Sequence, residues 1–560
     1  MLARVTSFSV EGLDAHRVHV EFDIRPGLPA FNILGLPPSA VRESRERVRA
    51  AVLNSGFAFP RQRVTANVAP GHLEKAGPSF DLALACGLLA ASDQIHGPGV
   101  DRIALFAELS LSGELRPCRG VLAVAEAAAR AGLRGLVVAR ANAAEAAQVP
   151  RLPVAGLGHL VEVTAALDGR RGFPGRGGGH RRPGSRADRP AGAGAEPAGP
   201  GFAATPAGMT ARPGGAGATG RPGAVPGEPD LADVRGQRGP IRALTVAAAG
   251  GHHLLLSGPP GVGKTMLARR LPSLLPPMGR AEALEVTKIH GIAGEHVGAG
   301  LVGRRPFRAP HHSISAVGLV GGGPLAMPGE AVLAHHGVLF LDELSEFSRP
   351  ALEALRSPLE SGRVAIVRRQ RTAVYPTRFM LVAAMNPCPC GHAGDTRGRC
   401  RCSEADLARH RAKLSGPMLD RIDLLVRVGR PTTTELRAPP LTSSGVVRER
   451  VLEARARQAA RLRETGVTCN AELDLRLLRT HGDIDPHAED ALQRAYERGS
   501  LSVRGQARAL RVARTVADLD GSTKVRATHV AVALGLHPEG ATALRSTGDK
   551  KEQNSYGIRV

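Results

Sequence analysis

The chain has 560 residues, more than one hydrophobic core usually organises, so two or three domains are expected. Hydrophobic residues make up 42% and charged residues 22%, which excludes a wholly disordered chain and a collagen-like repeat. The net charge of +23 is weak evidence for a nucleic-acid partner by itself, but it is uneven, with +1 over residues 1–168, +6 over 169–229 and +16 over 230–560. If the protein has a basic partner surface, it belongs to the C-terminal two-thirds.

Apolar runs such as residues 82–91 are far shorter than the ~20 residues that a membrane-spanning helix needs. The first residues, MLARVTSFSVEGLD, lack the charged and apolar regions of a secretory signal. We therefore expect a cytoplasmic protein that does not contact a membrane.

Strand and helix patterns alternate over residues 1–168, which predicts an α/β domain. Strands are expected at 5–10, 18–24, 63–68 and 136–138, and helices at 39–55, 80–91 and 120–131. Residues 169–229 differ: nearly half are Gly or Pro, with almost no aromatic or β-branched side chains. Such a segment buries too little apolar surface to fold, so it is predicted to be a disordered linker, although its arginines could touch an acidic partner.

A phosphate-binding loop is the strongest motif of the chain. A helix at 239–249 and a strand at 254–257 precede it, and a helix at 265–271 follows it. Its glycines let backbone N–H groups surround a phosphate at the start of a helix. Lys264 is expected to bridge the β- and γ-phosphates and Thr265 to ligate Mg²⁺, so ATP and Mg²⁺ are the expected ligands. The loop consists of Gly258, Pro259, Pro260, Gly261, Val262, Gly263, Lys264 and Thr265.

Two further apolar strands end in polar residues. Residues 338–341 precede Asp342 and Glu343, which could hold the water shell of Mg²⁺ and polarise the attacking water. The same acidic pair could instead cap a helix. The strand at 379–385 ends in Asn386, a position from which an amide can orient the water.

Basic residues gather in two segments between these strands. A hairpin is predicted over residues 362–379, and no acidic residue lies between 361 and 394. Arginines in such a hairpin would grip phosphates of DNA without reading sequence, or would contact neighbouring subunits. The segment 304–323, with three arginines and His311 and His312, is a second candidate for the same role. The hairpin arginines are Arg363, Arg368, Arg369, Arg371 and Arg378.

Four of the seven cysteines form a C-x-C-x₉-C-x-C cluster directly after Asn386. Four thiolates can enclose a tetrahedral Zn²⁺, and a metal here would brace the loop after Asn386. Plain reduced thiols and redox chemistry are the alternatives. The cluster consists of Cys388, Cys390, Cys400 and Cys402, with His392 inside it.

Residues beyond 432 predict only helices, at 448–463, 473–479, 488–498, 502–519 and 527–535, followed by a polar tail. Just before this region, Arg421 precedes a short strand, where an arginine could reach the γ-phosphate of a neighbouring subunit. Its alternative is a surface salt bridge to Asp420 or Asp423. Arg504 is our choice for an arginine that senses nucleotide from the helical region, with Arg508 and Arg511 as competitors.

The chain resembles the magnesium-chelatase-like AAA+ ATPases of the ComM/YifB group. The resemblance rests on RPFRAPHHSIS (305–315), GVLFLDELSEF (337–347), AAMNPCPCG (383–391), LSGPMLDRID (414–423), VARTVADLDG (512–521) and, in the N-terminal domain, VRESRERVRAAVLNSGFAFP (41–60). It implies an α/β fold with a Lon-protease-like N-terminal domain (1–168), an AAA+ P-loop ATPase core (230–431) and a C-terminal helical lid (432–545). The linker (169–229) and the polar tail (546–560) lie outside the resemblance. In this family Asn386 would be sensor 1, and the lid arginine sensor 2.

The resemblance also implies function. It implies a homo-hexameric ring with ATP between subunits and, in the ComM branch, a DNA helicase that promotes branch migration during natural transformation. Single-stranded or branched DNA is therefore the expected partner. The chelatase branch implies instead a motor that acts on a protein or metal–tetrapyrrole partner.

The N-terminal domain resembles the proteolytic domain of Lon, but without its catalytic pair. Residues 76–79 look like the nucleophile loop, with Ser79 at the nucleophile position. The position that carries lysine in Lon is Leu122 here, so no base for the serine is present. We expect no protease activity and interpret Ser79 as a helix cap in a ring-stabilising or partner-docking platform.

Overall fold

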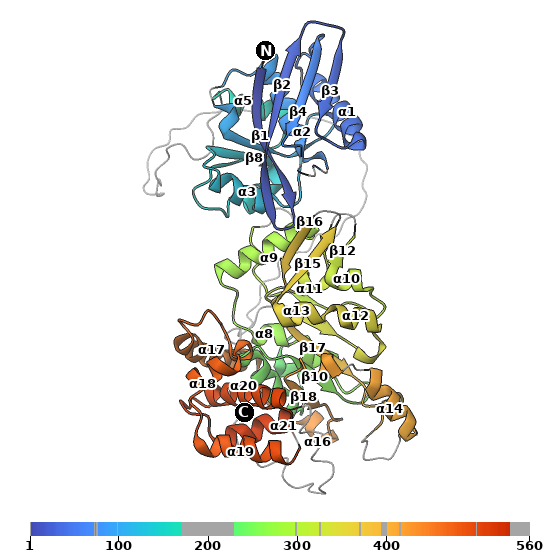
Figure 1. Cartoon of the computed structure of the whole chain (residues 1–560), viewed down its shortest axis with the longest axis vertical. Coiled ribbons are helices and arrows are strands. Elements are labelled where there is room, and N and C mark those ends of the chain that lie inside the picture. Colours follow the sequence, from blue (N-terminus) through green and yellow to red (C-terminus); the bar gives the residue numbers. More distant parts are fainter. Residues whose placement is uncertain are drawn as a thin grey trace, which may run out of the picture.

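The structure, a computed structural model, describes residues 2–170, 229–393, 400–499 and 501–537, apart from short gaps at 72, 74, 76, 98, 297–299, 324–325, 369–370 and 414–415. The predicted linker, except residues 169, 170 and 229, and the predicted tail lie outside these residues. Figure 1 shows an elongated chain, with an N-terminal unit at one end, a second sheet in the middle and a helical region at the other end. Among the described helices, none is long and apolar enough to cross a membrane.

The N-terminal unit is built on a mixed seven-stranded sheet with the order β3-β4-β2-β1-β5-β8-β9. Helices α1, α2 and α5 pack with one face of it, and α3 with the other, so two hydrophobic cores flank the sheet. The predicted strands and helices of this region are present. The strands are β1 (Leu2–Glu11), β2 (Asp14–Arg25), β3 (Ala30–Leu34), β4 (Arg63–Ala69), β5 (Ile103–Phe106), β8 (Gly135–Ala139) and β9 (Val154–Leu157), with a small ribbon of β6 (Glu108–Leu109) and β7 (Leu115–Arg116); the helices are α1 (Pro38–Asn54), α2 (Asp81–Ala91), α3 (Val121–Arg130), α4 (Ala143–Ala146) and α5 (Leu160–Leu167).

The middle unit contains a parallel five-stranded sheet with the order β11-β14-β17-β10-β18. Its strands β14 and β17 are buried at every residue, as expected for a parallel sheet covered on both faces. The predicted α/β fold is confirmed, and the structure adds that the sheet of this unit is parallel. The strands are β10 (Leu254–Ser257), β11 (Phe307–Arg308), β14 (Val338–Leu341), β17 (Met380–Met385) and β18 (Leu424–Arg427), and the helices are α6 (Arg238–Gly250), α7 (Lys264–Ala268), α8 (Leu271–Leu274), α9 (Arg280–Ala293), α10 (Ala316–Val320), α11 (Glu330–Leu333), α12 (Arg349–Ala354), α13 (Arg356–Ser361), α14 (Glu404–Lys413) and α15 (Gly416–Leu419).

The predicted hairpin is present as β15 (Arg363–Arg368) and β16 (Arg371–Pro376), which pair antiparallel. Its buried face packs Val364, Ile366 and Tyr375 against α9. A smaller ribbon, β12 (Gly321–Gly322) with β13 (Met327–Pro328), lies on α11 and α9.

The hairpin and α9 also contact the N-terminal unit (Figure 1). The Nζ atom of Lys288 on α9 lies 2.7 Å from a carboxylate oxygen of Glu126 on α3. At Gly12, in the turn between β1 and β2, a Cβ atom would lie 3.3 Å from Cβ of Ala373 on β16. The same hairpin that was predicted to bind DNA therefore packs on the N-terminal unit.

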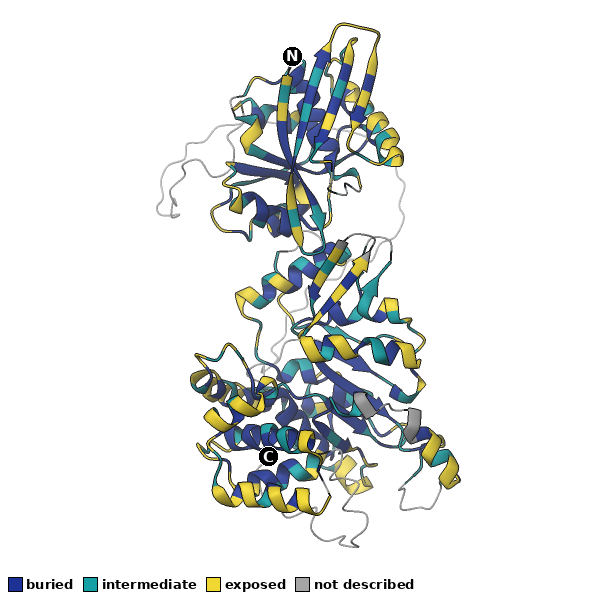
Figure 2. Ribbon diagram, in the orientation of Figure 1, coloured by how far each residue is buried: buried dark blue, intermediate teal, exposed yellow. Residues whose placement is uncertain are grey.

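The C-terminal region is helical, as predicted, and among its described residues only an isolated bridge between Ile484 and Val525 adds strand pairing. Its helices share one hydrophobic core with α6, α7 and one face of the parallel sheet, so the region is not a separately packed body. Their outer faces are exposed (Figure 2). The helices are α16 (Thr433–Arg437), α17 (Ser444–Arg461), α18 (Leu475–His481), α19 (Pro486–Glu497), α20 (Val503–Leu519) and α21 (Ala527–Leu536).

Candidate active site

The glycines of the phosphate-binding loop are required by its backbone. Gly261 and Gly263 have φ angles of +75° and +95°, in the left-handed region that favours glycine. At Gly258 a Cβ atom would lie 2.2 Å from the carbonyl oxygen of Val428, closer than real Cβ contacts allow. The loop therefore joins β10 to α7 in a turn that other residues would strain.

Lys264 is held at the centre of this loop. Its Nζ atom donates to the carbonyl oxygens of Gly258 and Pro259, at 2.7 and 2.9 Å, and to Oδ1 of Asn386, at 3.0 Å. Burial lowers the pKa of Lys264, while the charges of Asp342 and Glu343 oppose that shift. The predicted lysine and the predicted amide thus meet although 122 residues separate them.

Thr265 and Asp342 also meet, since β10 and β14 both pair with β17 in one parallel sheet and end at the same edge. The Thr265 hydroxyl donates to Oδ2 of Asp342 at 2.7 Å. A hydroxyl beside a carboxylate is an oxygen-ligand pair that suits Mg²⁺. These residues line a cavity of about 430 Å³, whose walls are Pro260, Gly261, Gly263, Lys264, Thr265, Met266, Asp342, Glu343, Met385 and Asn386.

Glu343 does not cap a helix. It precedes a short 3₁₀ turn, Leu344–Glu346, but its side chain makes no capping hydrogen bond there. Instead its carboxylate lines the cavity, and Oε2 lies 3.3 Å from Nδ1 of His312. Sequence reasoning placed His312 in a DNA-contacting segment and missed this contact, which depends on the edge strand β11 lying beside β14.

Arg421 is not paired with either of the acidic residues expected as alternatives. It forms an ion pair with Glu360, at the end of α13, and its side chain is only 14% exposed. Asp420 lies 3.6 Å from Arg504, and buried Asp423 lies near His252 and Arg511. The structure thus places Glu360, which the sequence did not suggest, against Arg421.

None of the three candidate lid arginines is among the residues that line the cavity. Arg504 has an 82% exposed side chain, so it lies at the surface of this chain. Arg508 is buried and donates to the carbonyl oxygens of Leu419 and Ile422, both at 3.1 Å. Arg511 donates to the carbonyl oxygen of Ala471 at 3.2 Å.

The two basic segments differ in how their arginines are engaged. Arg363 and Arg378 are exposed at the base of the hairpin, Arg368 and Arg371 are paired residues of its strands, and Arg369 lies outside the described residues. In the 304–323 segment, by contrast, Arg305 contacts Glu282, and Arg308 contacts Glu330 and Glu295. A hydrogen bond to Glu330 raises the pKa of Arg308, although burial opposes it. The hairpin therefore offers the more accessible basic surface.

The four cysteines of the predicted cluster lie together, and their sulfur atoms are all within 4.8 Å of one another. Cys388 lies 3.3 Å from Cys390 and 3.8 Å from Cys400, sulfur to sulfur, and Cys390 lies 3.7 Å from Cys400. Zn–S bonds of about 2.3 Å in a tetrahedron place sulfur atoms about 3.8 Å apart. The donor set and its spacing therefore fit one Zn²⁺.

Ser79 does not cap α2, so that prediction is wrong. It lies within the 3₁₀ turn Pro78–Phe80, which leads directly into the helix without a side-chain cap. The lysine nearest in sequence, Lys75, is buried and donates to the carbonyl oxygens of Val68 and Pro70, at 2.7 and 2.6 Å, and more weakly to that of Gly35. Its ammonium is thus used to hold the loop after β4.

Known families match three stretches of the chain. The model described as magnesium chelatase, subunit ChlI, matches residues 230–436; subunit ChlI of Mg-chelatase matches 20–142; and the subunit ChlI C-terminal model matches 441–537.

Individual relatives match over nearly the full length. An uncharacterized protein of Mycobacterium tuberculosis is 43% identical over 96% of this chain and 99% of its own length. Competence protein ComM of Haemophilus influenzae is 39% identical over 95% of this chain and 97% of its own, and the uncharacterized protein YifB of Escherichia coli is 38% identical over 93% and 94%. The chain therefore belongs to the magnesium-chelatase-like AAA+ family that includes ComM and YifB.

Proposed function

We propose that this protein is a ring-forming, Mg²⁺-dependent ATPase that moves along or remodels DNA. Membership of the chelatase-like AAA+ family implies an ATPase. The observation that carries the proposal is the convergence of Lys264, Thr265, Asp342, Glu343 and Asn386 at one cavity. A basic hairpin in the same unit supports DNA as the partner.

The residues of the cavity divide the work of ATP hydrolysis. Lys264 and the backbone N–H groups of the loop bind the phosphates. Glu343 takes the proton from the attacking water, and Asn386 orients that water by a hydrogen bond. Mg²⁺, held by Thr265 and Asp342, would neutralise charge on the phosphates.

Arg421 is proposed to complete the site of the neighbouring subunit, which requires a ring, most simply a hexamer. In a single chain it is paired with Glu360, so it must leave that carboxylate to reach a phosphate. Glu360 is followed after two residues by the first strand of the hairpin, so movement of the hairpin could release the arginine.

A mixing experiment tests the trans role. Arg421→Ala alone should reduce ATP hydrolysis about 100-fold or more, since arginines in this role contribute strongly to turnover. Lys264→Ala should be inactive because its own loop is defective. Mixed, the second variant supplies Arg421 to the intact loop of the first, so hydrolysis should rise well above the sum of the two alone. Equal activity before and after mixing would contradict the trans assignment.

DNA is the proposed partner because the hairpin presents arginines without neighbouring acidic residues in sequence. Few aromatic side chains accompany them, which favours binding of the phosphate backbone rather than base stacking. One relative is named a competence protein. A role in natural transformation or recombination, acting on single-stranded or branched DNA, is the corresponding proposal for this chain.

Measuring ATPase rate and DNA binding across a salt series tests this partner. We expect stimulation by single-stranded or branched DNA, and binding that weakens steeply with salt. Replacing Arg363, Arg368 and Arg371 by Ser should weaken binding at least tenfold and reduce the salt slope by about 0.7 for each phosphate that is no longer neutralised. The matched control is the same charge change on the C-terminal helices, Arg476, Arg479 and Arg494 to Ser. No stimulation and no salt-sensitive binding by the unaltered chain would remove DNA as the partner.

A chelatase-like motor acting on a protein or metal–tetrapyrrole partner is the second candidate. It is favoured by the match of all three chelatase subunit models. An ATPase rate that DNA does not change at any salt concentration would favour this second candidate.

Four smaller proposals concern the rest of the chain. The N-terminal unit is a Lon-like platform without protease activity, since Leu122 is buried at the position of the catalytic lysine and Lys75 is engaged elsewhere. The helical region acts as the lid. The protein is cytoplasmic, and the four clustered cysteines hold a structural Zn²⁺.

A further inference from the structure

The cysteine cluster contacts the nucleotide cavity at two places. Asn386, two residues before Cys388, accepts a hydrogen bond from Lys264 at 3.0 Å. Gly391, next to Cys390, lies against Pro260 of the phosphate-binding loop: a Cβ atom there would come within 2.7 Å of Cδ of Pro260. The segment that carries Cys388 and Cys390 therefore contacts both Lys264 and Pro260 of the phosphate-binding loop.

The segment that follows Cys402 also contacts Asn386. Helix α14 (Glu404–Lys413) begins two residues after Cys402. It carries His410, a buried residue whose Nε2 lies 2.9 Å from the carbonyl oxygen of Asn386. The segments before Cys388 and after Cys402 thus converge on Asn386, and a metal bound by the four sulfur atoms would close a ring of contacts through this residue.

The four cysteines differ in how far they are buried. Cys388 is buried and accepts a hydrogen bond from the backbone N–H of Ala393, but Cys390 is exposed and Cys400 and Cys402 are half-buried. A cross-link between positions 388 and 400 lowers the conformational entropy of the segment between them, and zinc bound to thiolates provides that cross-link. Such a cross-link would add to the contacts of Lys264 and His410 that hold Asn386, and to the packing of Gly391 on Pro260.

We propose that zinc in the Cys388–Cys390–Cys400–Cys402 cluster sets the ATP affinity of the neighbouring cavity. The zinc-bound loop fixes Asn386 beside Lys264 and supports the phosphate-binding loop through Gly391, so nucleotide binds to a preorganised site. Because binding free energies are reciprocal, ATP also holds the zinc more tightly. The inference rests on the ATP-binding part of the proposed function and is independent of DNA.

The test uses the full-length chain under reducing conditions. We expect one zinc per chain by elemental analysis. Removing it with a chelator that prefers Zn²⁺ to Mg²⁺ should weaken binding of a fluorescent ATP analogue about tenfold at constant Mg²⁺, within the usual range of coupling between sites. Adding Zn²⁺ back should restore the affinity. In the reverse direction, a non-hydrolysable ATP analogue should slow transfer of zinc to a chromogenic chelator.

Variants separate this linkage from loss of folding. Cys388→Ser with Cys400→Ser should lose zinc and bind the ATP analogue as weakly as the zinc-free chain, with unchanged helix content by circular dichroism. Cys118→Ser, a half-buried thiol of the N-terminal unit, is the control and should keep both zinc and affinity. A chain without zinc, or equal ATP affinity with and without zinc, overturns the linkage alone. A zinc-loaded chain that binds no ATP overturns the proposed function as well.

Discussion

Glu343→Gln should bind ATP and assemble normally but hydrolyse ATP at least 100-fold more slowly, the usual scale for loss of a general base. The amide keeps the size of the side chain but cannot accept the proton of the attacking water. The Glu343 carboxylate is 57% exposed in the cavity, so the change should not unfold the protein. Phosphate release at saturating ATP, binding of a fluorescent ATP analogue and light scattering measure the three properties.

The control is Glu346→Gln, three residues further along the same turn. Glu346 is exposed and does not line the cavity, so its loss should leave turnover unchanged. A normal rate of ATP hydrolysis by Glu343→Gln would contradict the assignment of Glu343 as the general base. A large loss of ATP affinity would instead show that Glu343 supports the cavity structurally.

The nucleotide cavity could largely be predicted from sequence because its parts follow buried parallel strands. The runs before Asp342 and Asn386 are apolar and buried throughout, and the run before Gly258 is three leucines followed by Ser257, as expected for the parallel strands β14, β17 and β10. Parallel strands end at the same edge, so residues that directly follow them meet without further information. The positive φ angles at positions 261 and 263 could also be expected, because both positions carry glycine.

Contacts chosen by the tertiary structure could not be predicted in the same way. Arg421 has acidic residues on both sides in sequence, yet it pairs with Glu360, on α13. Strand β11 has only two residues, too few for a pattern, although it brings the segment of His312 to Glu343. The expected cap at Ser79 failed for a local reason, because a 3₁₀ turn already enters the helix there.

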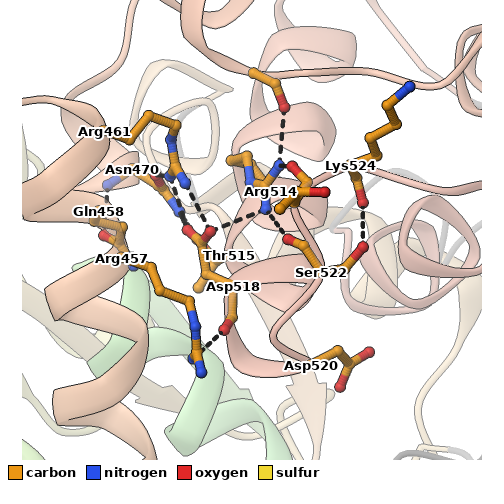
Figure 3. Close-up of polar contacts among 12 residues, drawn as sticks. Arg457, Gln458, Arg461, Asn470, Arg514, Thr515, Asp518, Asp520, Ser522 and Lys524 are labelled. Carbon is orange, nitrogen blue, oxygen red and sulfur yellow. Dashed lines mark hydrogen bonds and ion pairs between the residues drawn. The ribbon is translucent and has the colours of Figure 1, made fainter.

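A buried polar network attaches the helical region to the parallel sheet, and none of the sequence motifs reveals it. Asp518, on α20, accepts hydrogen bonds from Arg461 on α17 and from Arg514 one turn earlier, at 2.8–2.9 Å (Figure 3). Asn470 donates to the same carboxylate at 2.8 Å and to Thr515 at 3.0 Å. Thr515 in turn lies 2.7 Å from Nε2 of His252, at the start of the parallel sheet, so the network joins the helices to the ATPase core.

Asp518→Ala should therefore lower the free energy of unfolding by about 3–5 kcal/mol, as removal of one partner from a buried ion pair does. The buried Arg514 and the half-buried Arg461 would lose their shared carboxylate in the core that the helices share with the sheet. Urea-induced unfolding followed by circular dichroism measures the loss. Asp520→Ala, two residues later at a 27% exposed side chain beside His529, should cost less than about 1 kcal/mol, as surface pairs do. Equal losses for the two variants would mean that the Asp518 network does not fasten the helices to the core.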